Sequence, residues 1–137
     1  MKIVMTVFFF ALFTPLSVAG DTLYAALGEK QGIQTIVQRT ADLAFADDRT
    51  AEQFRHSKKE RLVLAITDQI CALSGGPCQY RGLNMKKAHF KLKITELEFN
   101  AFVESLQQAM RESGIGYHTQ NKLVALLAPM KRDIVER

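Results

Sequence analysis

Apolar residues recur at intervals of three and four over most of the chain, which is the spacing of one face of an α-helix. The pattern covers residues 31–45, 58–73, 95–113 and 119 onward, and nowhere do apolar and polar residues alternate over the length of a strand. Thr95 with Glu98 matches a capping box at the start of the third segment, and Pro129 should bend the fourth. We therefore predict one all-α domain.

The first twenty residues have the three-part pattern of a secretory signal peptide. Lys2 precedes an apolar run that ends at Leu16, and small residues follow up to Gly20. The run is shorter than the roughly 20 residues that a membrane span needs. We expect cleavage near Ala19 or Gly20, export to the periplasm or a comparable compartment, and a mature domain of residues 21–137 with no membrane segment. An uncleaved N-terminal anchor is the alternative.

The composition of the remaining chain narrows the class of protein further. Without the leader, 17 basic residues stand against 14 acidic ones, a net charge of +3. This mild excess does not call for nucleic acid, which requires a concentrated basic face. The length excludes large α/β barrels and enzymes with separate cofactor and substrate domains. We expect a monomer with no nucleic-acid partner.

One long connection, residues 74–94, does not fit a plain helix bundle. It holds three glycines and one proline, and its pattern allows one short helix from Asn84 to about Phe90. Long loops in compact domains tend to be functional. This one carries His89, flanked by lysines that could face the propionates of a haem: Lys86, Lys87, Lys91 and Lys93. Imidazole is a common ligand of haem iron. The alternative is a surface histidine in a solvated basic face.

Two metal sites are poor matches to this sequence. No second His or Cys stands near His89 at the spacing of a zinc site. The pattern Cys-x-x-Cys-His, which attaches c-type haem covalently, is absent.

Three separated segments share residues at fixed offsets with one known family. They are Leu23-Tyr24 with Leu27-Gly28 and Gly32-Ile33; Gly75-Gly76-Pro77-x-x-Tyr80-x-Gly82-x-x-Met85-x-x-Ala88-His89-x-x-Leu92-x-Ile94-Thr95; and Leu126-Leu127-Ala128-Pro129-Met130 with Asp133-Ile134-Val135. Over residues 21–137 the chain resembles the group 1 truncated haemoglobins. The resemblance implies a two-over-two helical sandwich around a b-type haem. It also implies a small gas ligand (oxygen, nitric oxide or carbon monoxide) and an electron donor as partners.

The resemblance also assigns roles to individual residues. His89 matches the proximal ligand of the iron, and Phe54 matches a ring-packing phenylalanine. The residues that fall where the family lines its pocket are Met85, Ile94, Phe99 and Phe102. We expect Lys86 and Lys93 to lie at the rim of the haem.

The distal side departs from the family. Ungapped counting places Ala41, with Thr40 beside it, where the family usually carries a tyrosine that donates to the bound gas. The usually polar positions of the distal helix fall at or near Leu62 and Ile66. We therefore expect an apolar distal pocket without such a donor, which costs affinity for oxygen. Gln69 is a further candidate donor.

His56 precedes the distal helix and is a candidate sixth ligand of the iron. Its alternative is a solvent-exposed histidine in a charged run.

The two cysteines, Cys71 and Cys78, lie on either side of the Gly-Gly-Pro turn. In an oxidising compartment they could form a disulfide; the alternative is one buried and one exposed thiol.

Three functions compete on this evidence. The chain is a gas-binding haem protein, a haem enzyme that acts on peroxide or nitric oxide, or a globin fold that has lost haem and binds a partner. The apolar distal side argues against the enzyme, and His89 within an intact motif argues against the third.

Overall fold

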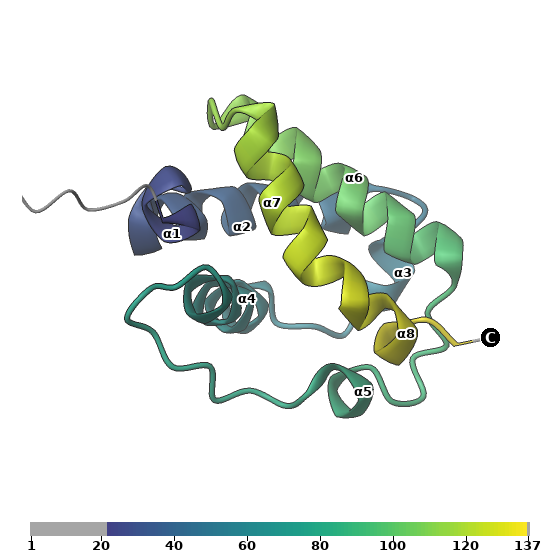
Figure 1. Cartoon of the computed structure of the whole chain (residues 1–137). Helices are drawn as coiled ribbons and strands as arrows, with labels where there is room; N and C mark the ends of the chain where they lie inside the picture. Colours follow the sequence, from purple (N-terminus) through teal and green to yellow (C-terminus); the bar gives the residue numbers. More distant parts are fainter. Residues whose placement is uncertain (1–21, 137) are drawn as a thin grey trace, which may run out of the picture.

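The computed structural model describes residues 22–136, which form helices and turns without any strand (Figure 1). In chain order the helices are α1 Leu23–Ala26, α2 Glu29–Ala46, α3 Ala51–Phe54, α4 Lys59–Leu73, α5 Met85–Ala88, α6 Glu96–Glu112, α7 Tyr117–Leu127, the 3₁₀ helix η1 Ala128–Met130, and α8 Lys131–Ile134. The predicted leader lies outside the described residues. Within them, no helix is long and apolar enough to cross a membrane.

The predicted all-α class is confirmed, and the four long helices begin and end within about two residues of their expected bounds. The capping box at Thr95 is present, because the Thr95 hydroxyl accepts from the Glu98 amide and the Glu98 carboxylate accepts from the Thr95 amide. The expected break at Pro129 is also present as η1 between α7 and α8. The short helices α1 and α3 were not predicted, since four residues are too few to show a helical period.

Helix α2 lies at the centre of the fold and packs against both α4 and α6. Its buried face carries Ile33, Ile36 and Val37, followed by the small residues Ala41 and Ala44. Small side chains let helix backbones approach closely, and α6 likewise buries small residues along its length. Burial of apolar surface between these helices is the main source of stability in such a fold. Figure 1 shows α7 lying across α6, with α4 and α5 on the other side of the molecule.

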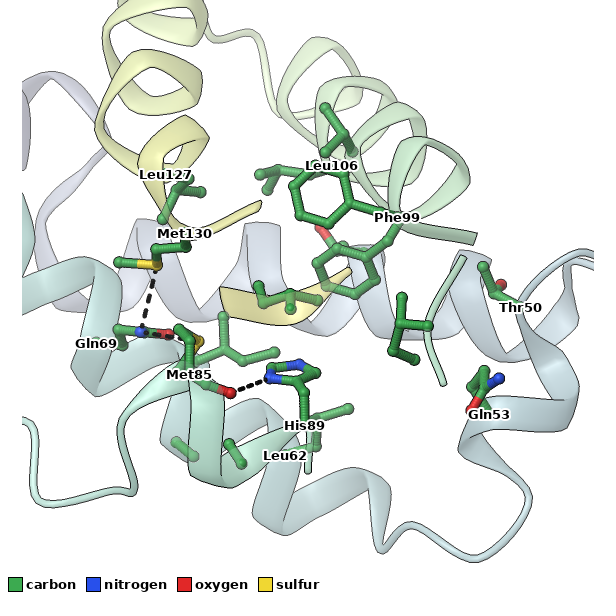
Figure 2. A pocket seen from close by; sticks show the side chains of 18 of the residues that line it. Thr50, Gln53, Leu62, Gln69, Met85, His89, Phe99, Leu106, Leu127 and Met130 are labelled. Atoms are coloured by element: carbon green, nitrogen blue, oxygen red, sulfur yellow. Dashed lines mark hydrogen bonds between the residues drawn. The ribbon is translucent and has the colours of Figure 1, made fainter. Parts of the chain in front are cut away.

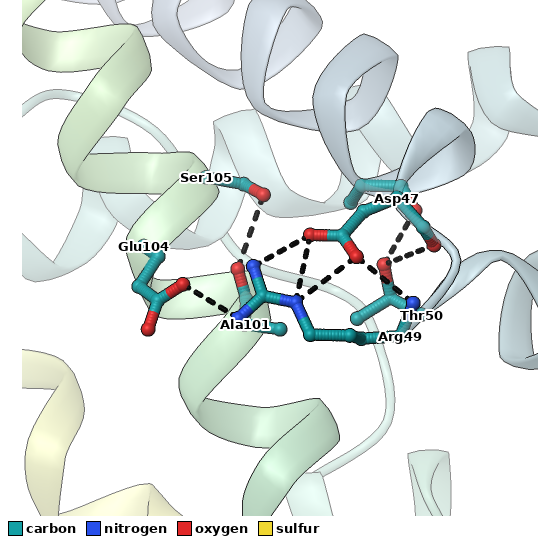
Figure 3. Close-up of polar contacts among 7 residues, drawn as sticks. Asp47, Arg49, Thr50, Ala101, Glu104 and Ser105 are labelled. Atoms are coloured by element: carbon teal, nitrogen blue, oxygen red, sulfur yellow. Dashed lines mark hydrogen bonds and ion pairs between the residues drawn. The ribbon is translucent and has the colours of Figure 1, made fainter.

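The turn after α2 is fixed to α6 by one arginine (Figure 3). The Arg49 guanidinium bonds the Asp47 carboxylate at 2.7 Å and the Glu104 carboxylate at 2.8 Å. This hydrogen-bonded cation lowers the pKa of Asp47 below its ordinary value. The Thr50 hydroxyl donates to the Ala44 carbonyl at 2.6 Å, which satisfies one of the unpaired carbonyls at the end of α2. The turn therefore holds α3 in a defined position.

Cys71 and Cys78 form a disulfide with their Cα atoms 5.7 Å apart, which confirms the bonded alternative. Cys71 is fully buried in α4, and Cys78 lies in the connection that leads to α5. Gly76 lies between them with no room for a side chain, since a Cβ atom there would lie 2.5 Å from the ring of Tyr24. The disulfide thus ties the end of α4 to the start of the segment that carries His89.

We expect the double substitution Cys71→Ser with Cys78→Ser to lower the free energy of unfolding by about 2.5 kcal/mol, because it removes a cross-link that closes a short loop. Urea unfolding of both proteins under non-reducing conditions measures the difference. Reduced wild type is the matched control and should lose a similar amount. Equal stability of oxidised wild type and the variant would contradict the assigned bridge.

Candidate functional site

A cavity of about 340 Å³ lies between α4 and α5 on one side and α6, α7 and α8 on the other (Figure 2). This volume falls within the range of pockets that hold small molecules and cofactors. Side chains from every helix except α1 line the cavity. Most are apolar, and the lining contains neither lysine nor arginine. The cavity suits a flat, largely apolar ligand.

Eight of the ten residues that the sequence assigned to the site line this one cavity. They are Phe54, Leu62, Ile66, Met85, His89, Ile94, Phe99 and Phe102. Lys86 and Lys93 are exposed and lie outside the lining. The structure thus brings together the apolar set and the histidine, but not the two lysines, whose place at a haem rim stays a prediction.

The local fold of α5 explains how His89 reaches the cavity. The Asn84 side chain accepts from the Lys87 amide and caps the single turn, which ends at His89. Nδ1 of His89 lies 2.9 Å from the carbonyl oxygen of Met85. A carbonyl can only accept, so Nδ1 must carry the proton. In the neutral ring, Nε2 then holds a free lone pair, and Figure 2 shows the ring directed into the cavity.

Three aromatic rings pack together beside α3, and two of them, Phe54 and Phe102, line the cavity. The rings of Phe45 and Phe54 stack with centroids 4.9 Å apart, and Phe54 lies 6.1 Å from the ring of Phe102. Lys59 Nζ lies 4.9 Å from the centroid of the Phe45 ring and also pairs with Asp42. Stacked aromatic rings supply a large apolar area with fixed geometry. Phe54 is therefore held from behind and presents its ring to the cavity.

The single acidic residue of the lining, Glu98, is fully engaged by donors. Its carboxylate accepts from the Thr95 amide and hydroxyl, both at 2.7 Å, and from Gln53 Nε2 at 2.8 Å. The Thr95 amide above all lowers the pKa of Glu98, and the Gln53 and Thr95 side chains add to this effect. Glu98 therefore stays ionised near neutral pH and serves the start of α6 rather than a proton transfer in the cavity.

The distal helix α4 presents Leu62, Ala65, Ile66 and Gln69 to the cavity on one stripe. On α2 the lining residues are Val37 and Thr40, while Ala41 faces the core instead. The expectation placed Ala41 at the distal position with Thr40 beside it. The structure puts the threonine at the cavity, because the rotation of α2 about its axis decides which of two neighbouring residues faces inward. Counting along the sequence without gaps does not show this rotation.

The hydroxyl groups and amides near the cavity are mostly committed to other acceptors. Thr40 Oγ1 donates to the Ile36 carbonyl at 2.8 Å, and Tyr80 donates to the Leu83 carbonyl at 2.7 Å. Gln69 Nε2 contacts only two thioether sulfurs, those of Met85 at 3.6 Å and Met130 at 3.8 Å (Figure 2). Thioethers are weak acceptors. Gln69 is thus the half-buried lining side chain with a donor still available.

Of the three histidines, only His89 lines the cavity. His56 and His118 are both exposed. His56 would have to leave its present position to reach an iron atom. Among residues 22–136 there is also no cluster of three or more His, Cys, Asp or Glu side chains that could hold a metal ion.

Comparison with known proteins identifies the class. The bacterial-like globin family model matches residues 22–136. The chain belongs to this family. The group 1 truncated haemoglobin of Tetrahymena pyriformis is 26% identical over 115 residues, which is 84% of this chain and 95% of that protein. The group 1 truncated haemoglobin GlbN of Mycolicibacterium paratuberculosis is 24% identical over 113 residues, 82% of this chain and 83% of that protein.

Solved structures agree with this assignment. The truncated haemoglobin from Tetrahymena pyriformis in its Fe(III) form superposes with a TM-score of 0.81, covering 85% of this chain and 99% of that one at 26% identity. The 2/2 haemoglobin from Synechococcus sp. PCC 7002 gives a TM-score of 0.79 at 21% identity and shows the shared fold. The resemblance predicted from the sequence motifs is therefore confirmed.

Proposed function

We propose that this chain is an exported b-type haem protein that reversibly binds a diatomic gas, with His89 as the proximal ligand of a pentacoordinate iron. The observation that carries the proposal is the orientation of His89. Its Nδ1 is tied to the Met85 carbonyl at 2.9 Å, and its Nε2 is free beside an apolar cavity. A second partner at Nδ1 is what orients a metal-binding imidazole and raises its basicity. Haem, when bound, supplies an iron with an open position for the gas.

The residues of the cavity fit this cofactor. Phe99 and Phe102 of α6 and Ile94 before it present apolar surface on one side, and Leu62 and Ile66 of α4 do so on the other. These side chains would exclude water from the iron and hold the ring by burial of apolar area. Lys86 in α5 and Lys93 after it are exposed, and we expect their ammonium groups to pair with the propionates.

Replacement of His89 tests the proposal directly. We expect His89→Gly, expressed with haem available, to lose the Soret band of the ferric protein or shift it to that of a weakly bound haem. Added imidazole should restore a spectrum close to wild type, because the free ring can occupy the vacated space. Absorption spectra of the ferric, ferrous and carbon monoxide forms provide the readout.

The matched controls for this experiment are His56→Ala and His118→Ala. Both histidines are exposed, so these variants should keep the wild-type spectrum. An unchanged spectrum in His89→Gly would contradict ligation by His89, and a changed one in His56→Ala would show a six-coordinate iron. Absence of any Soret band in wild type would favour a haem-free binding module.

We further propose that the distal side gives a bound gas little hydrogen-bond support. The threonine and tyrosine donors at the cavity are used by backbone carbonyls, and the α4 stripe carries Leu62 and Ile66. The Gln69 amide on the same stripe is turned toward the sulfurs of Met85 and Met130. A hydrogen bond to a ligand with partial negative charge is worth about 1.5–3 kcal/mol. Without this hydrogen bond, the rate constant for oxygen dissociation rises by about ten- to a hundredfold.

A donor placed on the distal helix should therefore slow oxygen release. We expect Ile66→Gln to lower the oxygen dissociation rate at least about tenfold, measured by stopped-flow displacement with carbon monoxide. Ile66→Leu is the control, since it changes the shape of the side chain without adding a donor, and it should stay near the wild-type rate. A wild-type rate already as slow as that of Ile66→Gln would contradict the apolar distal side.

Export is supported by two observations that are independent of haem. The leader pattern precedes the domain that matches the family, and the bridge between Cys71 and Cys78 is of a kind that persists in oxidising compartments. We expect secreted material to have the mass of a chain that begins near Gly20 or Asp21, about two mass units lighter than the same chain with two free thiols. Intact-mass spectrometry with and without reduction measures both. A chain that retains Met1 would contradict cleavage.

A further inference from the structure

The charge of this chain is distributed unevenly around α5. Residues 69–95 contain five basic residues and no Asp or Glu, whereas the other described residues contain eleven basic and thirteen acidic ones. The segment thus carries a net charge of +5 on a molecule whose remaining described surface is slightly negative. We call it the α5 face. Its cations are Arg81, Lys86, Lys87, Lys91 and Lys93.

None of these five cations is neutralised by an ion pair within residues 22–136, and all five are exposed. The acidic residues that flank the segment are engaged elsewhere. Asp68 pairs with Lys30 at 3.0 Å, and Glu96 pairs with Lys131 at 3.1 Å. Glu136 accepts from the backbone amide of Lys93, not from its ammonium. In the holoprotein Lys86 and Lys93 would pair with the propionates, so Arg81, Lys87 and Lys91 carry the outward positive potential of this face.

Two large apolar side chains on the α5 face are also uncovered. Leu83, just before α5, is 59% exposed, and Phe90, directly after His89, is 68% exposed. Lys91 Nζ lies 5.2 Å from the centroid of the Phe90 ring. Exposed apolar side chains in a basic segment fit the apolar core and polar rim of a protein interface. A membrane surface fits less well, because α5 is a single turn and two apolar side chains give little area to bury in a bilayer.

We propose that the α5 face is the docking surface for an acidic protein that delivers one electron to this globin. The proposal rests on the proposed function, since it takes His89 as the ligand of haem iron. Phe90 adjoins His89 in the chain, so a partner seated on this face lies next to the proximal side of the site. The partner's reduced centre loses one electron, ferric iron becomes ferrous, and no atom or proton is transferred.

Charge reversal on this face tests the proposal. A reduced plant-type [2Fe–2S] ferredoxin serves as the probe, because it is an acidic one-electron carrier. We expect it to bind holoprotein in calorimetric titration at low ionic strength and to reduce the ferric protein in stopped flow. Lys87→Glu with Lys91→Glu should lower the association constant and the bimolecular rate at least about tenfold, and salt should weaken wild type to a similar degree because it screens the charges.

The matched control is Arg111→Glu with Lys122→Glu, which changes the net charge equally at exposed cations outside the α5 face. This control should stay within about twofold of wild type. An equal loss in both double variants would overturn the proposal, since net charge alone would explain it. A second result would also overturn the proposal. In it, the protein binds vesicles of 30% phosphatidylglycerol in phosphatidylcholine through Lys87 and Lys91 but does not bind ferredoxin.

The calorimetric titration does not require haem, so it separates this proposal from the proposed function. Ferredoxin binding by a chain without a Soret band would overturn electron delivery and the haem assignment together. A normal Soret band with no ferredoxin binding at low salt would overturn only the docking surface.

Discussion

The hydrogen bond between His89 Nδ1 and the Met85 carbonyl is the interaction on which the functional site depends. It fixes the tautomer of the ring and its direction at the same time. A histidine at the end of a one-turn helix would otherwise rotate among several rotamers, most of them pointing to solvent. The Asn84 cap holds that turn, and α8 packs against it. The His89 ring is thus positioned by local backbone geometry, without an acidic partner at Nδ1.

The side chains of the surrounding helices do not fill the cavity. Phe54, Phe99 and Phe102 remain half-buried although they lie in the middle of the chain's apolar pattern. Protein interiors normally pack as densely as organic crystals, so such a hollow leaves dispersion contacts unmade. A ligand that binds only the folded state and covers these rings would raise the free energy of unfolding. The apolar core around α2 lies beside the cavity and holds the fold together. The cavity can therefore stay open.

The sequence predicted those parts of the structure that follow from local pattern. The long helices, the capping box and the bend at Pro129 depend on spacing within one segment, and the motif around His89 singled out the histidine that lines the cavity. Ala41 was placed at the cavity where the structure has its neighbour Thr40, because one residue of helix rotation separates the core from the cavity. The pairing of Arg49 with Glu104 could not be foreseen, since it joins elements more than fifty positions apart. The disulfide remained one of two alternatives until the distance between the two Cα atoms was known.

The segment from Cys71 to Thr95 combines two requirements that usually conflict. It must hold His89 steady, yet it has little regular structure and its α5 face is left uncovered. The disulfide anchors its start in the buried end of α4, and the capping box anchors its end in α6. Between these points Lys91 and Lys93 adopt left-handed backbone with φ of 64° and 54°. That conformation is unfavourable for residues with a side chain, so the two anchors and the Asn84 cap must over-determine it. The rigidity of the site therefore comes from the two ends of this segment. The middle of the segment stays open to solvent on one side and to the cavity on the other.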